Sequence, residues 1–314
     1  MRHSYGLQDI LIQNAWLTIG SYDGVHLGHQ QIIKQITAGA HQVGAPAVVL
    51  TFFPHPSTVL RKAKNAFYLT LPEEKARLLG EMGVDEVITH PFNHEIAETE
   101  PEDFIKQLST HLGIRHLWVG YDFALGKDRR GDVPFLTELG KQFGFEVHVI
   151  EAFKLDGEIV SSSRVRKAVE DRDILTANRL LGHPFAVSGT VIPGDGRGAT
   201  IGIPTANLQI AEERAVPGSG VYACLAEVDG QTYPAVTNIG VRPTFEETSV
   251  PPRIETHILD FSENIYGEEI SLAFVDFLRP EQKFSGVDEL VTQIKADIEK
   301  GREILENQGS GAYH

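Results

Sequence analysis

The chain has 314 residues, of which 41% are hydrophobic and 23% charged, and its formal net charge at pH 7 is −15. This length predicts two domains, and this composition excludes a largely disordered chain. The negative charge argues against non-specific binding of nucleic acid. It is unevenly divided, because residues 1–182 carry 19 basic and 23 acidic side chains whereas residues 183–314 carry 9 and 20.

The N-terminal sequence lacks a secretory signal pattern, and no apolar run approaches the ~20 residues of a membrane span. We therefore expect a cytoplasmic protein with no membrane partner. The single cysteine, Cys224, lies in the apolar run "GVYACLAEV". It is predicted to be a small core residue rather than a reactive thiol.

Up to about residue 182, short apolar runs alternate with segments of helical period, which predicts a parallel sheet covered by helices. The runs are "AWLTIG", "AVVLTFF", "DEVITH", "HLWVGYDF" and "FEVHVI". After the first run, Ile32, Ile36, Ala40 and Val43 repeat on one helical face, and this helix should stop at Gly44. Two later helices are predicted to begin with capping boxes, which pair Thr70 with Glu73 and Thr99 with Glu102.

From residue 183 the pattern changes to short β-branched and aromatic runs separated by Gly and Pro, which predicts a small closed antiparallel barrel. Asp229-Gly230 is a hairpin signal. The last element is an amphipathic helix with Leu290, Ile294 and Ile298 along one side, and it should pack against the barrel. The predicted domains are therefore 1–182 and 183–306, followed by a flexible tail at 307–314.

The stretch "DGVHLGHQ" follows the first predicted strand, at the edge where doubly wound sheets bind nucleotides. His26 and His29 flank the first turn of the next helix, whose free N–H groups attract anions, and Gly28 allows close approach to the backbone. They are either phosphate-binding residues or ordinary surface histidines in a turn. The stretch "VSSSRVR" at residues 160–166 offers hydroxyls and two guanidiniums at another helix start, which suits a polyphosphate. Together the two motifs favour nucleotide binding.

These motifs resemble those of the HxGH nucleotidylyltransferases, and in particular the FMN adenylyltransferase half of the bacterial bifunctional riboflavin kinase/FAD synthetase family. The matching stretches are "SYDGVHLGH", "TFFPHP", "GYDFALG" and "VSSSRVR", in the family's order and spacing. The resemblance implies a Rossmann-like doubly wound domain in which His26 and His29 bind the ATP phosphates and stabilise the transition state. It also implies two further sets of residues. The ATP-binding set is Asp23, Gly24, Gly28, Ser161, Ser162 and Arg166, and the set lining the nucleotide and flavin cleft is His55, Tyr121 and Asp122.

Three positions depart from the family pattern. Ser21 replaces the commoner Asn, Ser163 replaces Thr, and Leu125 replaces an aromatic residue. The first two keep a polar group, whereas Leu125 is expected to alter contacts with the flavin. His55 lies between two prolines, and either a structural or a substrate-facing role fits that loop. The sequence has no Walker A motif and no Cys/His cluster with zinc-binding spacing, so a P-loop NTPase is not supported.

In the second half, "GDGRGATIGIPTANL" combines a glycine-rich loop with Thr205 and Asn207. Such a loop is either a phosphate-binding loop or a long barrel turn, and the two side-chain oxygens suit Mg²⁺. "PTANL", "GVYA", "NIGVRPTF", "IETHILDF" and "FLRPEQKF" resemble the riboflavin kinase half of the same family. The resemblance implies ATP binding by Gly196, Gly198, Gly202 and Thr205, Mg²⁺ ligation by Thr205 and Asn207, and Glu255 as the general base.

The function expected from these features is bifunctional. The C-terminal barrel should phosphorylate riboflavin to FMN with ATP, and the N-terminal domain should adenylylate FMN to FAD with release of pyrophosphate. The expected partners are riboflavin, FMN and ATP, with no nucleic acid. One alternative is a protein that binds flavin as a carrier without catalysing a reaction. Such a protein would not need the charged groups and the metal-binding groups together. An adenylyltransferase for a nicotinate or pantetheine phosphate leaves the second half unexplained.

Overall fold

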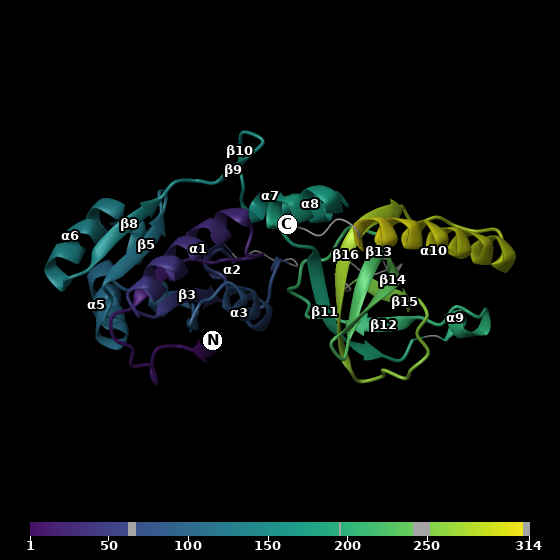
Figure 1. The fold of residues 1–314 in the computed structure, drawn as a ribbon, viewed down its shortest axis with the longest axis horizontal. Helices are drawn as coiled ribbons and strands as arrows, with labels where there is room; N and C mark the ends of the chain where they lie inside the picture. The colour runs from purple at the N-terminus through teal and green to yellow at the C-terminus, as the bar shows by residue number, and fades with distance from the viewer. Residues whose placement is uncertain (62–66, 195, 241–251, 310–314) are drawn as a thin grey trace. The chain divides into compact units, whose positions relative to one another are not determined.

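The structure is a computed structural model that describes residues 1–61, 67–194, 196–240 and 252–309. Its contacts divide the chain into two compact units, Met1–Ser162 (unit 1) and Ser163–His314 (unit 2), shown as a ribbon in Figure 1. The boundary expected at residue 182 lies after α7 (Ser162–Glu170) and α8 (Ile174–Leu181). The second of these helices packs on the barrel, because the Asn178 side chain donates a hydrogen bond to Phe274 O and accepts one from Phe185 N.

Unit 1 is built on a six-stranded parallel sheet in the order β1-β4-β3-β2-β5-β8. The strands are β1 (Arg2–Tyr5), β2 (Trp16–Ile19), β3 (Ala47–Phe53), β4 (Glu86–Pro91), β5 (His116–Gly120) and β8 (Glu146–Ile150). Five of them are the predicted apolar runs, and β1 was not predicted. The chain order reverses on either side of β2, and such a switch point is where doubly wound sheets bind ligands.

Helices cover both faces of this sheet. One core contains residues of α5 (Pro101–Leu112) and α6 (Val133–Phe143), and another contains residues of α1 (Leu27–Gln42) and α3 (Pro72–Glu81). The remaining elements of unit 1 are short: α2 (Pro56–Arg61), α4 (His94–Ala97), a 3₁₀ turn (Lys127–Arg129), and the paired strands β6 (Ala124–Leu125) with β7 (Gly131–Asp132) and β9 (Lys154–Leu155) with β10 (Glu158–Ile159). The predicted doubly wound fold is confirmed.

Three local predictions in unit 1 were wrong. Both capping boxes fail because a proline occupies the first turn of each helix, so α3 and α5 begin after Leu71 and Glu100 rather than after the threonines. Glu74, not Glu73, accepts the hydrogen bond from the N-cap N–H of Leu71. On α1 the fully buried face holds Ile33, Ile36, Thr37 and Ala40, whereas Val43 is 68% exposed, because the helix ends at Gln42.

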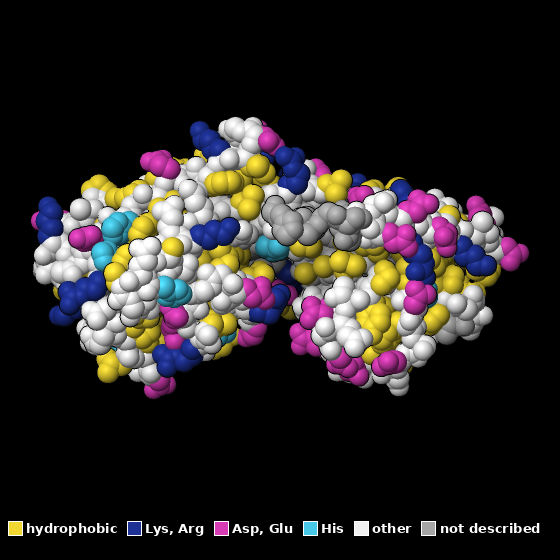
Figure 2. All heavy atoms as spheres, in the orientation of Figure 1, with side chains coloured by type: hydrophobic (Ala, Val, Ile, Leu, Met, Phe, Trp, Pro, Cys, Tyr) yellow, Lys and Arg dark blue, Asp and Glu magenta, His cyan; other side chains and the backbone are white. Residues whose placement is uncertain are grey.

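Unit 2 contains a closed barrel in the order β11-β12-β15-β14-β13-β16, as predicted. Its strands are β11 (Phe185–Ile192), β12 (Ala206–Gln209), β13 (Gly220–Val228), β14 (Gln231–Gly240), β15 (Arg253–Ile258) and β16 (Glu269–Arg279), with a short helix α9 (Arg197–Thr200) between the first two. Asp229 and Gly230 both have positive φ in the hairpin between β13 and β14, as a type I′ turn requires. Figure 2 shows acidic side chains over the visible face of unit 2, in line with its negative charge.

The long helix α10 (Val287–Gly309) packs on the barrel through Ile298, Ile304 and Leu305. It continues beyond the end predicted at residue 306, and residues 310–314 of the expected tail lie outside the described part of the chain. Cys224 is fully buried, and burial raises the pKa of its thiol to about 12, so the prediction of an inert core cysteine is confirmed. Across the described residues, no helix combines the length and apolarity needed to cross a membrane.

Candidate active sites

In unit 1, the predicted site residues follow neighbouring strands of the sheet. His55 comes after β3, His26 and His29 come after β2, and Tyr121 follows β5. These three strands are adjacent, and the carboxyl ends of parallel strands meet at one edge of a sheet. The topology therefore brings these segments to the same edge.

The two histidines of the opening motif are stacked on each other. His26 is the N-cap of α1, and its Nδ1 accepts a hydrogen bond of 3.4 Å from the N–H of His29. The ring centroids lie 3.6 Å apart with an interplanar angle of 15°. His26 is 5% exposed, and the Nδ1 atom of His29 is buried without a hydrogen-bond partner among the described residues. The motif thus places two imidazoles at the positive end of a sixteen-residue helix.

The loop before these histidines is held by Asp23. Its buried carboxylate accepts hydrogen bonds of 2.9 and 3.0 Å from the N–H groups of Leu69 and Thr70. The Thr70 hydroxyl in turn accepts the N–H of Gly24 at 2.9 Å. Asp23 therefore shapes the loop from within, a role that the sequence motif did not reveal.

The serine motif is joined to the same loop. Ser162, the first residue of α7, donates a hydrogen bond of 2.9 Å from its hydroxyl to the backbone oxygen of Asp23. Ser161 precedes it, and Arg166 follows on the half-buried side of the helix. The serine motif is thus joined by one hydrogen bond to the loop that precedes the two histidines.

A buried lysine at this site was missed by the sequence analysis. Lys75 is 3% exposed, and its Nζ donates to the backbone oxygen of Ser21 at 2.7 Å and to the hydroxyl of Thr51 at 3.3 Å. Burial lowers the pKa of Lys75 to about 8, although the Asp23 carboxylate acts in the opposite direction. The signal was present in the sequence, because Lys75 occupies a core-facing position of α3 together with Pro72, Ala76 and Leu79.

Lys75 and the two histidines act on one another electrostatically. Burial, with the neighbouring charges of His26 and Lys75, holds the pKa of His29 well below its ordinary value. The His29 ring is therefore neutral at pH 7, with one nitrogen that donates and one that accepts. A cationic lysine beside the neutral His29 ring makes a site that favours an anionic ligand.

The structure gives a local reason for a glycine at position 28, in addition to the predicted close approach of a ligand to the backbone. A Cβ at this position would lie 3.2 Å from Cε1 and 3.3 Å from Nδ1 of His26. A side chain there would therefore press on the stacked histidine. Gly24 has a φ of +80°, in the left-handed region that favours glycine.

The remaining predicted residues of unit 1 differ in their surroundings. The His55 ring is held by a 2.7 Å hydrogen bond between its Nδ1 and the Ser57 hydroxyl, while Tyr121 and Asp122 are exposed. Leu125 is buried in the core cluster with the α5 and α6 residues, so its side chain packs inside the unit. The expected effect of Leu125 on flavin contacts therefore has no direct basis in this structure.

In unit 2, the predicted kinase residues surround one cavity of about 450 Å³, which we call the barrel pocket. Its lining includes Gly196, Gly198, Thr205, Asn207 and Glu255. Leu290, Ile294 and Ile298, the predicted apolar side of α10, also line it. Gly202 is not part of the lining, and its φ of +77° shows a turn conformation instead.

The register of the barrel strands brings the polar groups of this pocket together. Asn207 on β12 is paired with Glu255 on β15, and Glu255 is paired on its other side with Asn238 on β14. Arg253, which the sequence analysis did not single out, donates from its Nε to Asn207 Oδ1 at 2.9 Å and lies 2.6 Å from Glu255 Oε1. One guanidinium therefore orients both predicted functional side chains.

Two glycines of the loop are required by close contacts. A Cβ at Gly194 would lie 2.0 Å from Asn207 Nδ2, and one at Gly198 would lie 2.3 Å from the backbone oxygen of Ile203. The loop thus fits closely over Asn207. Residues 241–245 of the predicted "NIGVRPTF" motif lie outside the described residues.

Comparisons with known proteins agree with both halves. A model of the FAD synthetase family matches residues 10–164, and a model of the riboflavin kinase family matches residues 181–305. The bifunctional riboflavin kinase/FMN adenylyltransferase of Listeria monocytogenes is 39% identical over 92% of this chain and 92% of its own length. The protein of the same name from Escherichia coli is 38% identical over 92% of each.

Among solved structures, the crystal structure of a macrolide-efflux protein from Streptococcus pneumoniae matches with a TM-score of 0.85 and 30% identity, over 96% of this chain and 98% of that chain. It therefore has the same fold over nearly the whole length. The curated relatives and both family models name the same two activities. The chain belongs to the bifunctional riboflavin kinase/FMN adenylyltransferase family, whose members phosphorylate riboflavin to FMN and adenylylate FMN to FAD.

Proposed function

We propose that His26 and His29 bind the phosphates of ATP during adenylylation of FMN. The observation that carries this assignment is the buried His29 Nδ1 without a partner, beside the cationic Lys75 and at the N-terminus of α1. In this reaction an oxygen of the FMN phosphate attacks the α-phosphorus of ATP, and pyrophosphate leaves. The imidazoles and the free N–H groups of the helix stabilise the negative charge that gathers on the phosphates.

Ser161, Ser162 and Arg166 complete the nucleotide site. Ser162 is supported by its hydrogen bond to the backbone of Asp23 in the histidine loop. Asp23 and Gly24 act by holding that loop, while His55, Tyr121 and Asp122 line the cleft that receives the flavin. The adenylyltransferase function thus belongs to residues 1–182 and the kinase function to residues 183–306.

In the barrel pocket, Glu255 accepts the proton of the ribityl 5′-hydroxyl as this oxygen attacks the γ-phosphorus of ATP. The glycine loop, with Gly196, Gly198, Gly202 and Thr205, covers the ATP. Glu255 is positioned by Arg253 and by its cross-strand partner Asn207, and these contacts support its assignment.

The oxygen donors of the pocket fit Mg²⁺. Thr205 supplies a hydroxyl and Asn207 an amide oxygen, both hard ligands, and both line the cavity beside Glu255. Bound there, Mg²⁺ would offset the charge of the transferring phosphoryl group. The expected cellular location is the cytoplasm, where riboflavin, FMN and ATP are the partners.

Two variants test the assignments, with each reaction measured separately by chromatography of the flavins. His29→Ala should lower FAD formation from supplied FMN by about 100-fold or more, because a donor to the developing charge is lost. Glu255→Gln should lower FMN formation from riboflavin by about 100-fold or more, because the proton acceptor is lost. Each variant should keep the other activity.

His41→Gln and Glu227→Gln serve as matched controls, because both residues lie outside the two sites and are exposed. Neither control should change either rate. Loss of both activities in a folded His29→Ala or Glu255→Gln protein would contradict the proposed roles.

A further inference from the structure

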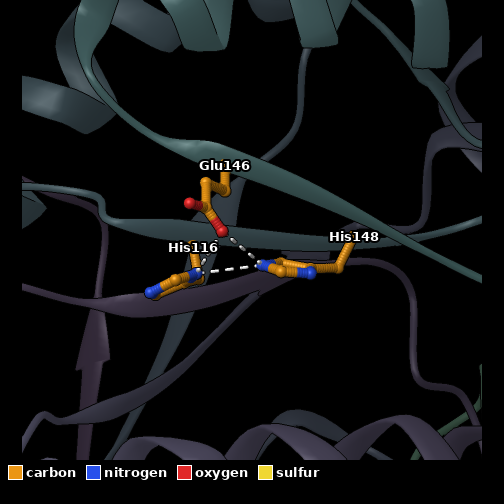
Figure 3. Close-up of side chains that lie close together, drawn as sticks. All are labelled: His116, Glu146 and His148. Atoms are coloured by element: carbon orange, nitrogen blue, oxygen red, sulfur yellow. Dashed lines mark hydrogen bonds and ion pairs between the residues drawn. The ribbon is translucent and has the colours of Figure 1, made fainter.

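A second cluster of histidines lies on unit 1, away from the nucleotide site. His116 opens β5, and Glu146 and His148 lie two residues apart on β8, so both point to the same face of the sheet. The parallel register pairs His116 with Glu146 and Trp118 with His148. Figure 3 shows the three side chains converging, with one carboxylate oxygen of Glu146 directed at a nitrogen of each imidazole.

Three atoms of this cluster form a triangle. His116 Nδ1 lies 2.9 Å from His148 Nε2, and Glu146 Oε2 lies 3.7 Å from each of these nitrogens. A point equidistant from the three atoms is about 2.0 Å from each, which matches the bond lengths of Zn²⁺ to imidazole nitrogen and carboxylate oxygen. Across residues 1–61, 67–194, 196–240 and 252–309, this is the one group of three candidate ligands found so close together.

The ligand types and their exposure select the kind of ion. Two imidazoles and one carboxylate suit a divalent transition metal, whereas Mg²⁺ prefers oxygen ligands. The side chains are 25% (His116), 32% (His148) and 74% (Glu146) exposed, so an ion from solution reaches them and a fourth ligand position stays open to water.

His116 and Glu146 are the first residues of β5 and β8 and His148 lies within β8, whereas the predicted nucleotide site follows the carboxyl ends of the strands. A metal ion here is therefore separate from the Mg²⁺ expected in catalysis. We propose that His116, Glu146 and His148 bind one divalent transition-metal ion of the Zn²⁺ type, with water as the fourth ligand.

The chain carries its own reporter for this site. Its only two tryptophans, Trp16 and Trp118, have ring centroids 4.1 Å from His116 and 4.5 Å from His148 respectively. In the full-length protein, freed of metal by a chelator and kept in excess Mg²⁺, Co²⁺ should quench the tryptophan fluorescence and saturate at one ion per chain. Zn²⁺ should displace Co²⁺ and restore the emission.

His148→Gln should weaken binding of Co²⁺ and Zn²⁺ by about 100-fold, because loss of a direct ligand costs at least as much as loss of its support. His41→Gln is the matched control, since His41 pairs with Asp85 alone at 2.9 Å and should bind metal like the wild type. The proposal is overturned if quenching does not saturate. It is also overturned if His148→Gln binds as tightly as the wild type, as it would if the ion were held by His26 and His29.

Discussion

The two active sites bind the same nucleotide but are constructed differently. In unit 1 the proposed site is a loop and a helix start, where burial lowers the pKa values of Lys75 and His29. In unit 2 the site is assembled across barrel strands, where Asn207 and Glu255 are neighbours in register although far apart in sequence. A site of the first kind can be found from a local motif, whereas a site of the second kind depends on strand pairing.

The largest effect that separates the two sites is expected from Gly194→Ala. A Cβ there would lie 2.0 Å from Asn207 Nδ2, so the pocket side chains must move. We expect FMN formation to fall by about 100-fold, because displacements near 1 Å have effects of this size. FAD formation from supplied FMN should not change. Gly286→Ala is the control, since its Cβ would meet no atom within 4 Å, its φ lies outside the left-handed region, and it does not line the pocket. If FMN formation fell equally in both variants, the loss could not be due to the contact between the new Cβ and Asn207.

The next effect concerns the buried cation of unit 1. Lys75→Met keeps the apolar volume but removes the charge, and FAD formation should fall by about tenfold as charge stabilisation is lost. Thr51 still donates to Ser21 O at 3.0 Å, so this carbonyl keeps a partner. In NMR titration the pKa of His29 should rise, because a neighbouring positive charge is gone. An unchanged His29 titration would show that the two groups are not coupled.

Lys75 also predicts an alkaline limit for adenylylation alone. Its pKa of about 8 means that the charge is present below this pH and is lost above it. The kcat/KM for FAD formation should therefore fall as pH rises through about 8, and this limb should be absent from Lys75→Met. The kinase reaction should not show it. If the same fall in kcat/KM at alkaline pH persisted in Lys75→Met, it would belong to another group.

A smaller effect is expected on stability in acid. Burial holds the pKa of His29 below its unfolded value of 6.5, so the unfolded chain binds protons more readily. Stability is fully present above about pH 6.5 and is lost as pH falls towards the folded pKa, by at most about 1.4 kcal/mol per pH unit for this group. Measured by urea unfolding at several pH values, the free energy of unfolding of His29→Gln should depend less on pH than that of the wild type. An equal pH dependence would contradict the assignment.

No effect on either activity is expected from thiol reagents. Cys224 is 0% exposed with its pKa raised to about 12, so an alkylating reagent should leave the native protein unmodified. Mass spectrometry should detect alkylation only after unfolding in denaturant. Modification of the native protein would show that the barrel opens at β13.

The sequence predicted those features that depend on local pattern. The alternating runs gave the parallel sheet and the barrel, and the two histidines lie at a helix start as expected. Features set by contacts between distant segments were missed. Local pattern misled at the two capping boxes, where a proline opens each helix after Leu71 and Glu100. Contacts between distant segments, such as that of the Gly24 N–H with the Thr70 hydroxyl, have no local signal.

The same reason explains the missed site residues. Arg253 contacts Asn207 only through strand pairing, and His116 meets His148 only because β5 and β8 are neighbours. Residue spacing in the sequence carries no sign of such pairs. Lys75 is the exception, because a charged residue at a core-facing helical position is a visible signal.

The central claim is that the two sites work separately on one chain. The most direct measurement mixes His29→Ala with Glu255→Gln and follows FAD made from riboflavin and ATP. Each variant alone should make almost no FAD, whereas the mixture should make it, because FMN released by the first protein is adenylylated by the second. Failure of the mixture, with each variant retaining its single activity, would contradict this account.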